Sequence, residues 1–163
     1  MMFESLSGML AVAVATLAAA EPKWVTYRSP SGFYSVDHPG NWRVERSENI
    51  VNIIPDDESG AVTISAYLGK PAAGAPKQLI SKAFGAYQSI SPLVTVTGSG
   101  WKGFRQAFLD KSQTPHRELV VVIATSAGGM VIITWNEVSP RTGERASVYG
   151  RIFDSLKLSK PRR

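Results

Sequence analysis

Three glycines in the segment "GSGWKG" form the sharpest chemical motif of the sequence. Gly98, Gly100 and Gly103 have the G-x-G-x-x-G spacing that lets a helix start approach a pyrophosphate in dinucleotide-binding folds. The following "FRQAFLDKSQTP" is broken too early for the required helix, and Glu118, the acid nearest the expected spacing, precedes its strand instead of ending it. We therefore interpret the glycines as a link between two sheet strands and predict no nucleotide cofactor.

The two histidines, His38 and His116, are the candidates for imidazole chemistry. The chain has no Cys, no closely spaced histidine pair and no G-x-S-x-G sequence, which argues against a zinc site and a serine-hydrolase elbow and excludes a cysteine nucleophile. We interpret His38 as a polar residue that ends a strand and His116 as one that starts a strand. We name no catalytic residue and expect a protein that is not an enzyme. A hydrolase without a recognisable motif is an alternative.

An acidic triplet, Asp56, Asp57 and Glu58, offers carboxylate oxygens of the kind that Ca²⁺ binds. The triplet lacks the alternating ligand spacing of an EF-hand loop. Asp is also favoured in β-turns, where its side chain bonds to the local backbone. We expect an acidic β-turn and no metal site, and we leave calcium binding at this turn open.

The C-terminal segment is basic, with Arg141, Arg145, Arg151 and the tail "KPRR", in a chain of net charge +5. Such a segment could dock on an anionic surface, although a solvated helix face is the simpler interpretation. The predicted partners are another envelope protein or an anionic surface. Nucleic acid is not expected, because the protein is predicted to be exported.

The export prediction rests on "GMLAVAVATLAAA", residues 8–20, an apolar run too short to cross a bilayer, which takes about 20 residues. Ala18 and Ala20 fit the small-x-small rule for cleavage before Glu21, whereas Glu4 and the lack of a leading Lys or Arg do not fit a signal peptide. We expect a signal peptide over 1–20 and one domain over 21–163. The protein would be periplasmic or secreted, with membrane association at most peripheral.

Turn signals and hydrophobic periods predict the elements of this domain. An apolar stripe from Leu79 to Ile90 predicts a helix over 76–90. A second apolar stripe, which runs through Leu156, predicts a last helix with Ser139 as its N-cap and Lys157 at its carboxyl end. The remaining apolar runs predict strands over 24–29, 33–38, 42–47, 50–55, 61–69, 93–98, 101–110, 116–125 and 130–136.

Two of these strands, "LVVVIA" and "MVIIT", are apolar at consecutive positions, which is typical of strands covered on both faces. The "SAGG" between them is too short to join parallel strands, so the pair must be antiparallel. The predicted fold class is therefore α+β, an α-β-α sandwich with a central antiparallel sheet and about two main helices.

The segment "SPSGFYSVDHPGNWRV", residues 29–44, resembles the N-terminal signature of the PsbP-like superfamily. The resemblance continues through a mid-chain helix, the strand entry at Gly100–Phe104, a long hairpin and a final helix ending in "IFDSLKL". It implies an α-β-α sandwich in which Phe33 and Trp42 anchor the N-terminal hairpin. Characterised members mostly bind proteins or support assembly, and no binding residue is carried over.

From this resemblance and the predicted export, we expect a non-catalytic exported binding or assembly protein. Besides the hydrolase, a second alternative is a small-ligand or lipid carrier. Such a carrier would have a deep apolar pocket beside the sheet.

Overall fold

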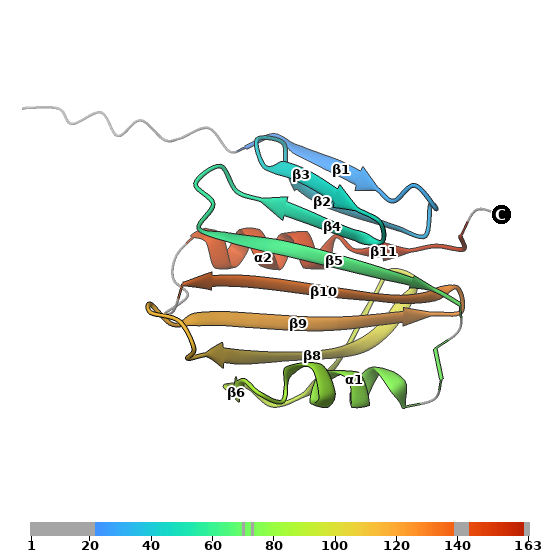
Figure 1. The fold of residues 1–163 in the computed structure, drawn as a ribbon. Coiled ribbons are helices and arrows are strands. Elements are labelled where there is room, and N and C mark those ends of the chain that lie inside the picture. Colours follow the sequence, from blue (N-terminus) through green and yellow to red (C-terminus); the bar gives the residue numbers. More distant parts are fainter. Residues whose placement is uncertain (1–21, 70, 73, 139–143, 162–163) are drawn as a thin grey trace, which may run out of the picture.

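A computed structural model describes residues 22–69, 71–72, 74–138 and 144–161, which form two sheets and two helices (Figure 1). The predicted signal peptide over 1–20 and its cleavage before Glu21 lie outside the described residues. Neither helix in the described part of the chain is long and apolar enough to cross a membrane.

The larger sheet has the strand order β3-β4-β5-β10-β9-β8-β6, and β7 also pairs with β8. All of its pairings are antiparallel. Its strands are β3 (Arg43–Ser47), β4 (Ile50–Ile54), β5 (Gly60–Leu68), β6 (Gln88–Ser89), β7 (Val94–Gly98), β8 (Trp101–Asp110), β9 (Arg117–Ser126) and β10 (Gly129–Val138).

A smaller sheet joins β1 (Trp24–Arg28), β2 (Tyr34–Pro39) and β11 (Lys157–Leu158) in the order β1-β2-β11. In Figure 1 it lies toward the top together with α2 (Glu144–Asp154), whereas α1 (Ala75–Phe84) lies at the bottom beside β8. The larger sheet has α2 and the smaller sheet on one side and α1 on the other, because Val120 and Val122 share a core with Phe33 and Tyr149, whereas Val121 and Ile123 share one with Ile80. This arrangement confirms the predicted α+β class.

Strand β9 is the centre of both hydrophobic cores. Its residues 120–124 are all buried, and they alternate between the two faces of the sheet. Val120 and Val122 belong to the core under α2, with Tyr149 and Ile152. Val121 and Ile123 belong to the second core, under α1. The prediction of a strand covered on both faces is confirmed for β9.

Strand β10 differs from that prediction, because its residues alternate between buried and half-buried along its length. Val131, Ile133 and Trp135 face the core under α2, and the side chains between them are partly exposed. The main contacts of α1 are with β8 and β9. Met130 and Ile132 of β10 pack at the edge of the core under α1 and stay half-buried there.

Both helices end earlier than the periodicity predicts. Helix α1 begins with Pro76 in its first turn and ends at Gly85, and the chain then forms β6, which leaves Ile90 exposed. Helix α2 ends at Asp154, and the next segment, predicted as helix, pairs with β2 as β11. The predicted N-cap Ser139 lies outside the described residues.

Hydrogen bonds to backbone carbonyls explain why α2 ends at Asp154. The N–H of Leu158 donates to the carbonyl of Ser99 at 3.1 Å, and the indole Nε1–H of Trp101 donates to the carbonyl of Leu156 at 3.0 Å. These long-range bonds fix an extended chain where the apolar stripe alone predicts helix.

The N-terminal hairpin is anchored as the resemblance implies. Phe33 is fully buried in the core under α2. Trp42 is half-buried and packs against the same core, with its ring edge-to-face on Tyr149 at a centroid distance of 5.6 Å. Such aromatic pairs add to the stabilisation that comes from buried area.

We expect Trp42→Ala to lower the free energy of unfolding by about 3 kcal/mol, the lower end for buried aromatics, because the ring is only half-buried. Urea unfolding monitored by circular dichroism measures this change. Val25→Ala, on an exposed face of β1, serves as the control and should change stability by less than about 0.5 kcal/mol. Equal midpoints for Trp42→Ala and the parent would show that the ring does not anchor the hairpin.

The ionisation of the Tyr149 hydroxyl makes the free energy of unfolding depend on pH above about pH 10. Burial, aided by the nearby charge of Glu137, raises the pKa of Tyr149 to about 12, whereas an unfolded tyrosine titrates near pH 10. Because the folded state holds the proton more tightly, this contribution is complete below about pH 10 and is lost as pH rises toward 12.

We expect the free energy of unfolding to fall less steeply above pH 10 in Tyr149→Phe than in the parent. Some fall should remain, because burial also raises the pKa of Tyr34. At pH 7 the variant should be as stable as the parent or more so, because the Tyr149 hydroxyl has no hydrogen-bond partner among the described residues. Urea titrations from pH 7 to 11 measure both effects, and identical slopes above pH 10 would refute the role of Tyr149.

Candidate functional site

A cavity in the described part of the chain lies between the start of α1 and the sheet. We call it the α1 hollow; its volume is about 670 Å³, it opens to solvent, and its lining is mostly apolar. It is lined by Pro71, Ala72, Gly74, Pro76 and Lys77 around the start of α1, by Thr95 of β7, by residues 102–104 of β8 and by residues 125–127 at the end of β9.

The strand register explains how these segments meet. Phe104 pairs with Thr95 on one side and with Ile123 on the other, and Lys102 pairs with Thr125. Residues two apart on a strand share a face, so Lys102 and Phe104 both point to the side that α1 covers. Phe104 also packs against the core under α1, which places apolar surface beneath the hollow.

Two cations are the charged groups of the hollow. Lys77 and Lys102 are both exposed, and neither forms an ion pair with a described residue. No carboxylate or imidazole occurs among the described lining residues. Hydroxyl groups complete the polar part, and the Thr125 Oγ1 donates to the carbonyl of Lys102 at 2.9 Å. The arrangement suits the binding of an apolar group more than acid–base chemistry.

The glycine motif is a link between strands, as interpreted from the sequence. Gly98 ends β7, and Trp101 begins β8 after a two-residue turn. Gly100 has a φ of 80°, and a Cβ there would lie 2.4 Å from the carbonyl oxygen of Leu158. A Cβ at Gly103 would lie 1.8 Å from the carbonyl oxygen of Ile123. Backbone packing therefore accounts for Gly100 and Gly103, and no helix follows the motif.

The histidines lie in separate sheets and each bonds to nearby backbone. His38 is buried in β2, where its Nδ1 donates to the carbonyl of Pro39 at 2.9 Å. His116 is exposed just before β9, and its Nδ1 donates to the carbonyl of Gln113 at 2.9 Å. The structure does not bring the two imidazoles into one site.

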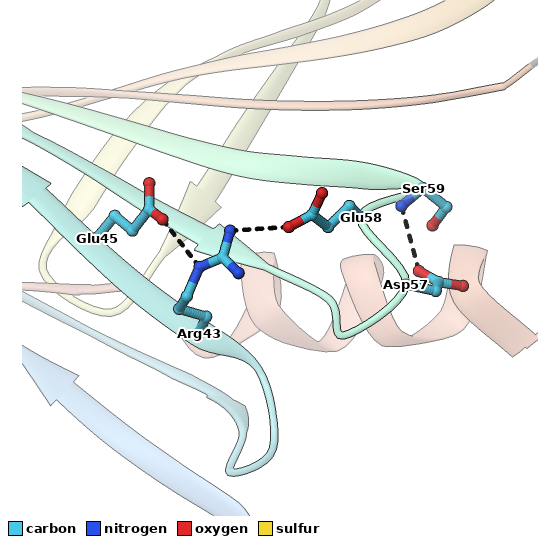
Figure 2. A network of polar contacts seen from close by, with 5 residues as sticks. All are labelled: Arg43, Glu45, Asp57, Glu58 and Ser59. Carbon is cyan, nitrogen blue, oxygen red and sulfur yellow. Dashed lines mark hydrogen bonds and ion pairs between the residues drawn. The ribbon is translucent and has the colours of Figure 1, made fainter.

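The acidic triplet forms a turn, and Figure 2 shows its Glu58 beside Arg43 and its Asp57 beside the backbone of Ser59. Arg43 lies between Glu45 and Glu58, with its Nε 2.8 Å and its Nη2 3.1 Å from their respective Oε1 atoms. The hydrogen bonds, first to Glu58 and then to Glu45, raise the pKa of Arg43.

The other two carboxylates of the turn have partners too. Asp57 accepts the backbone N–H of Ser59 at 3.2 Å, as Figure 2 shows, and pairs with Arg145 of α2. Asp56 accepts from the Asn41 side chain at 2.8 Å. Within the described ranges, no group of three or more His, Cys, Asp or Glu side chains is placed to hold a metal ion.

The basic C-terminal segment is only partly described. Arg145 binds Asp57, and Arg151 lies over the ring of Trp24 at 4.0 Å from its centroid. Arg141 and residues 162–163 lie outside the described residues. Both described arginines therefore contact other elements of the fold.

Sequence reasoning did not identify the α1 hollow. Its lining comes from four separate stretches of the chain, and no local pattern reports a space between them. The available signals were weak, namely the "PAAGAP" before α1 (residues 71–76), with its small residues and prolines, and Lys102 beside Phe104 at a two-residue spacing.

Comparison with known proteins gives a fold. No protein-family model matches the chain, and no curated protein matches it. Among solved structures, cyanobacterial PsbP (CyanoP) from Synechocystis has a TM-score of 0.61 and 10% identity, covering 95% of this chain and 98% of its own. LpqN, involved in cell envelope biogenesis of Mycobacterium tuberculosis, has a TM-score of 0.56 and 14% identity, with coverages of 84% and 91%.

A protein from Bacteroides thetaiotaomicron is also similar, with a TM-score of 0.62 and 17% identity over 83% of this chain. The match spans about half, 48%, of that longer protein. At these identities the likeness concerns the fold. The chain has a PsbP-like fold, which confirms the resemblance inferred from residues 29–44.

We expect calcium, at up to about 10 mM, to leave the melting temperature unchanged, although weak extracellular calcium modules bind below that level. The reason is that Asp57 and Glu58 already bind arginines. Asp57→Asn should lower stability by at most about 1 kcal/mol, as for an exposed ion pair, and should not alter the response to calcium. A saturable calcium shift in the parent that is lost in Asp57→Asn would identify the turn as a calcium site.

Proposed function

We propose that the protein is a non-catalytic exported binding protein of the carrier kind, the alternative raised from the sequence, and that it takes an apolar ligand in the α1 hollow. The observation that carries this proposal is the hollow itself. Ligand pockets typically measure about 300–1,000 Å³ and are lined mainly by apolar groups with a few polar ones. At about 670 Å³, with Pro71, Pro76 and Phe104 beside two lysines, the hollow fits that description.

The lining supports binding over catalysis. A hydrolytic site needs a nucleophile held by a base, or a general acid and base close together. The described lining residues supply hydroxyls and lysines but no histidine and no carboxylate. The two histidines of the chain bond to backbone carbonyls elsewhere.

The structural neighbours support a place in the cell envelope. LpqN is involved in cell envelope biogenesis, and its fold covers 84% of this chain. The apolar run over 8–20 supports export on independent grounds.

A second candidate is an assembly protein that docks another envelope protein, and a separate surface favours it. Ile50, Tyr67 and Leu68 lie at adjoining ends of β4 and β5 and are 38%, 46% and 58% exposed. Ile50 pairs with Ser65 and therefore shares a face of the sheet with Tyr67, whereas Leu68 points to the opposite face. Exposed apolar side chains that share a face are typical of docking surfaces. The α1 hollow is favoured because it is a concave site of about 670 Å³, whereas these residues lie at the end of the sheet.

The proposal is tested with the neutral fluorescent probe N-phenyl-1-naphthylamine. We expect saturable fluorescence enhancement with the parent and at least a tenfold loss of affinity in Thr95→Trp, because the indole would fill the hollow from β7. Val94→Trp is the control, since Val94 is exposed on the opposite face of β7 and does not line the hollow. Strands accept Trp well, so both variants should fold.

Circular dichroism confirms that the two variants are folded. No saturable binding by the parent, or equal losses in both variants, would overturn the proposal. Binding that depends on Tyr67 or Leu68 instead would support the assembly candidate.

A further inference from the structure

The charges at the α1 hollow point to a class of ligand. We propose that the hollow binds a single-chain anionic amphiphile, a long-chain fatty carboxylate, with its alkyl chain against Phe104 and its carboxylate between Lys77 and Lys102. This inference rests on the proposed function, because it requires that the hollow accepts an apolar ligand. It adds the headgroup and the two residues that recognise it.

Lys77 and Lys102 reach the hollow from different elements. Lys77 belongs to the first turn of α1, and Lys102 is the second residue of β8. Lysine lays its methylene stem along apolar surface while its ammonium stays in water. Two exposed lysines that line an apolar hollow therefore place positive charge at its opening and leave the floor apolar.

The charge at this opening is uncompensated within the described part of the chain. No acidic residue lines the hollow, and neither lysine is in an ion pair there. The arginines near acids behave differently, since Arg43 and Arg145 both form ion pairs. A carboxylate brought by a ligand would supply the missing counter-charge at Lys77 and Lys102.

The start of α1 adds to the positive electrostatic potential at the opening of the hollow. Its first turn has no acidic residue, and Gly74 at the N-cap supplies no side-chain cap. The positive end of the helix dipole is therefore not neutralised by its own side chains. Gly74 and Pro76 line the hollow, so this end of the helix faces the proposed headgroup.

The apolar part favours an alkyl chain over a peptide. A peptide brings a backbone donor and acceptor with nearly every residue, and each needs a partner when buried. The described lining is mostly apolar and offers few such groups. A chain of methylenes needs none, and each buried methylene contributes about 0.8 kcal/mol, or roughly a fourfold gain in affinity.

The test compares laurate with dodecanol, which has the same chain length and no charge, by displacement of N-phenyl-1-naphthylamine from the protein. We expect laurate to bind roughly tenfold more tightly than dodecanol at low salt. The double variant Lys77→Gln/Lys102→Gln should bind laurate as weakly as dodecanol, and its affinity for dodecanol should be unchanged. Lys82→Gln, in the last turn of α1 and outside the hollow, is the matched control.

Two further measurements test the separate contributions of the carboxylate and the alkyl chain. The advantage of laurate over dodecanol should shrink as salt rises, because salt screens exposed charges. From decanoate to tetradecanoate, affinity should rise by up to about fourfold per methylene until the hollow is filled.

The outcomes separate the two proposals. Equal binding of laurate and dodecanol in the parent, or an equal loss of laurate affinity in Lys82→Gln, would overturn the inference and leave an apolar ligand site in place. Failure of both ligands to displace the probe would also overturn the inference. If the probe itself shows no saturable binding, the proposed function fails as well.

Discussion

Strand β9 imposes the constraint on which the rest of the structure depends. Residues 120–124 are apolar at every position and buried on both faces, so the chain must cover both sides of its sheet. On one side the cover is extensive: Tyr149, Ile152 and Phe153 of α2 pack there with Phe33 and Leu158 from around the smaller sheet. On the other side the cover is α1, which places Ile80 against Val121 and Ile123.

The two covers differ in extent, and this difference produces the α1 hollow. Ten residues of α-helix span about 15 Å, whereas ten residues of strand span about 34 Å. Helix α1 therefore covers about half the length of β9, and Figure 1 shows it running beside β8. Toward the start of α1 the cover is made by Pro71, Ala72 and Gly74. These residues have little side chain with which to fill the space above Phe104.

The strands other than β6 and β11 followed from the sequence, with their hairpins, because their signals are local. The two-residue loop between β9 and β10, the turn at Pro39-Gly40 and the glycine link between β7 and β8 each lie within a few residues of the pattern that predicts them. The end of α2 could not be predicted in this way. Leu156 continues the helical stripe of Tyr149, Ile152 and Phe153, but Ser99, Trp101 and β2 bind this segment from more than fifty residues away.

The structure also changes the interpretation of which basic residues are available to bind an anion. From the sequence, the basic character of the protein draws attention to the arginine-rich C-terminal segment. In the structure, Arg145 binds Asp57, and Arg151 lies over Trp24, so both guanidinium groups contribute to the fold. This use suits arginine, whose planar group pairs with carboxylates and stacks on aromatic rings.

The lysines at the α1 hollow have no such partner among the described residues. A lysine ammonium is compact and strongly hydrated, so it keeps its charge at an exposed position without a fixed partner. Lys77 and Lys102 therefore remain available to a ligand, whereas Arg145 and Arg151 would have to break existing contacts to bind one. On this basis the α1 hollow is the better candidate for recognising an anion, although the C-terminal segment holds more positive charge in sequence.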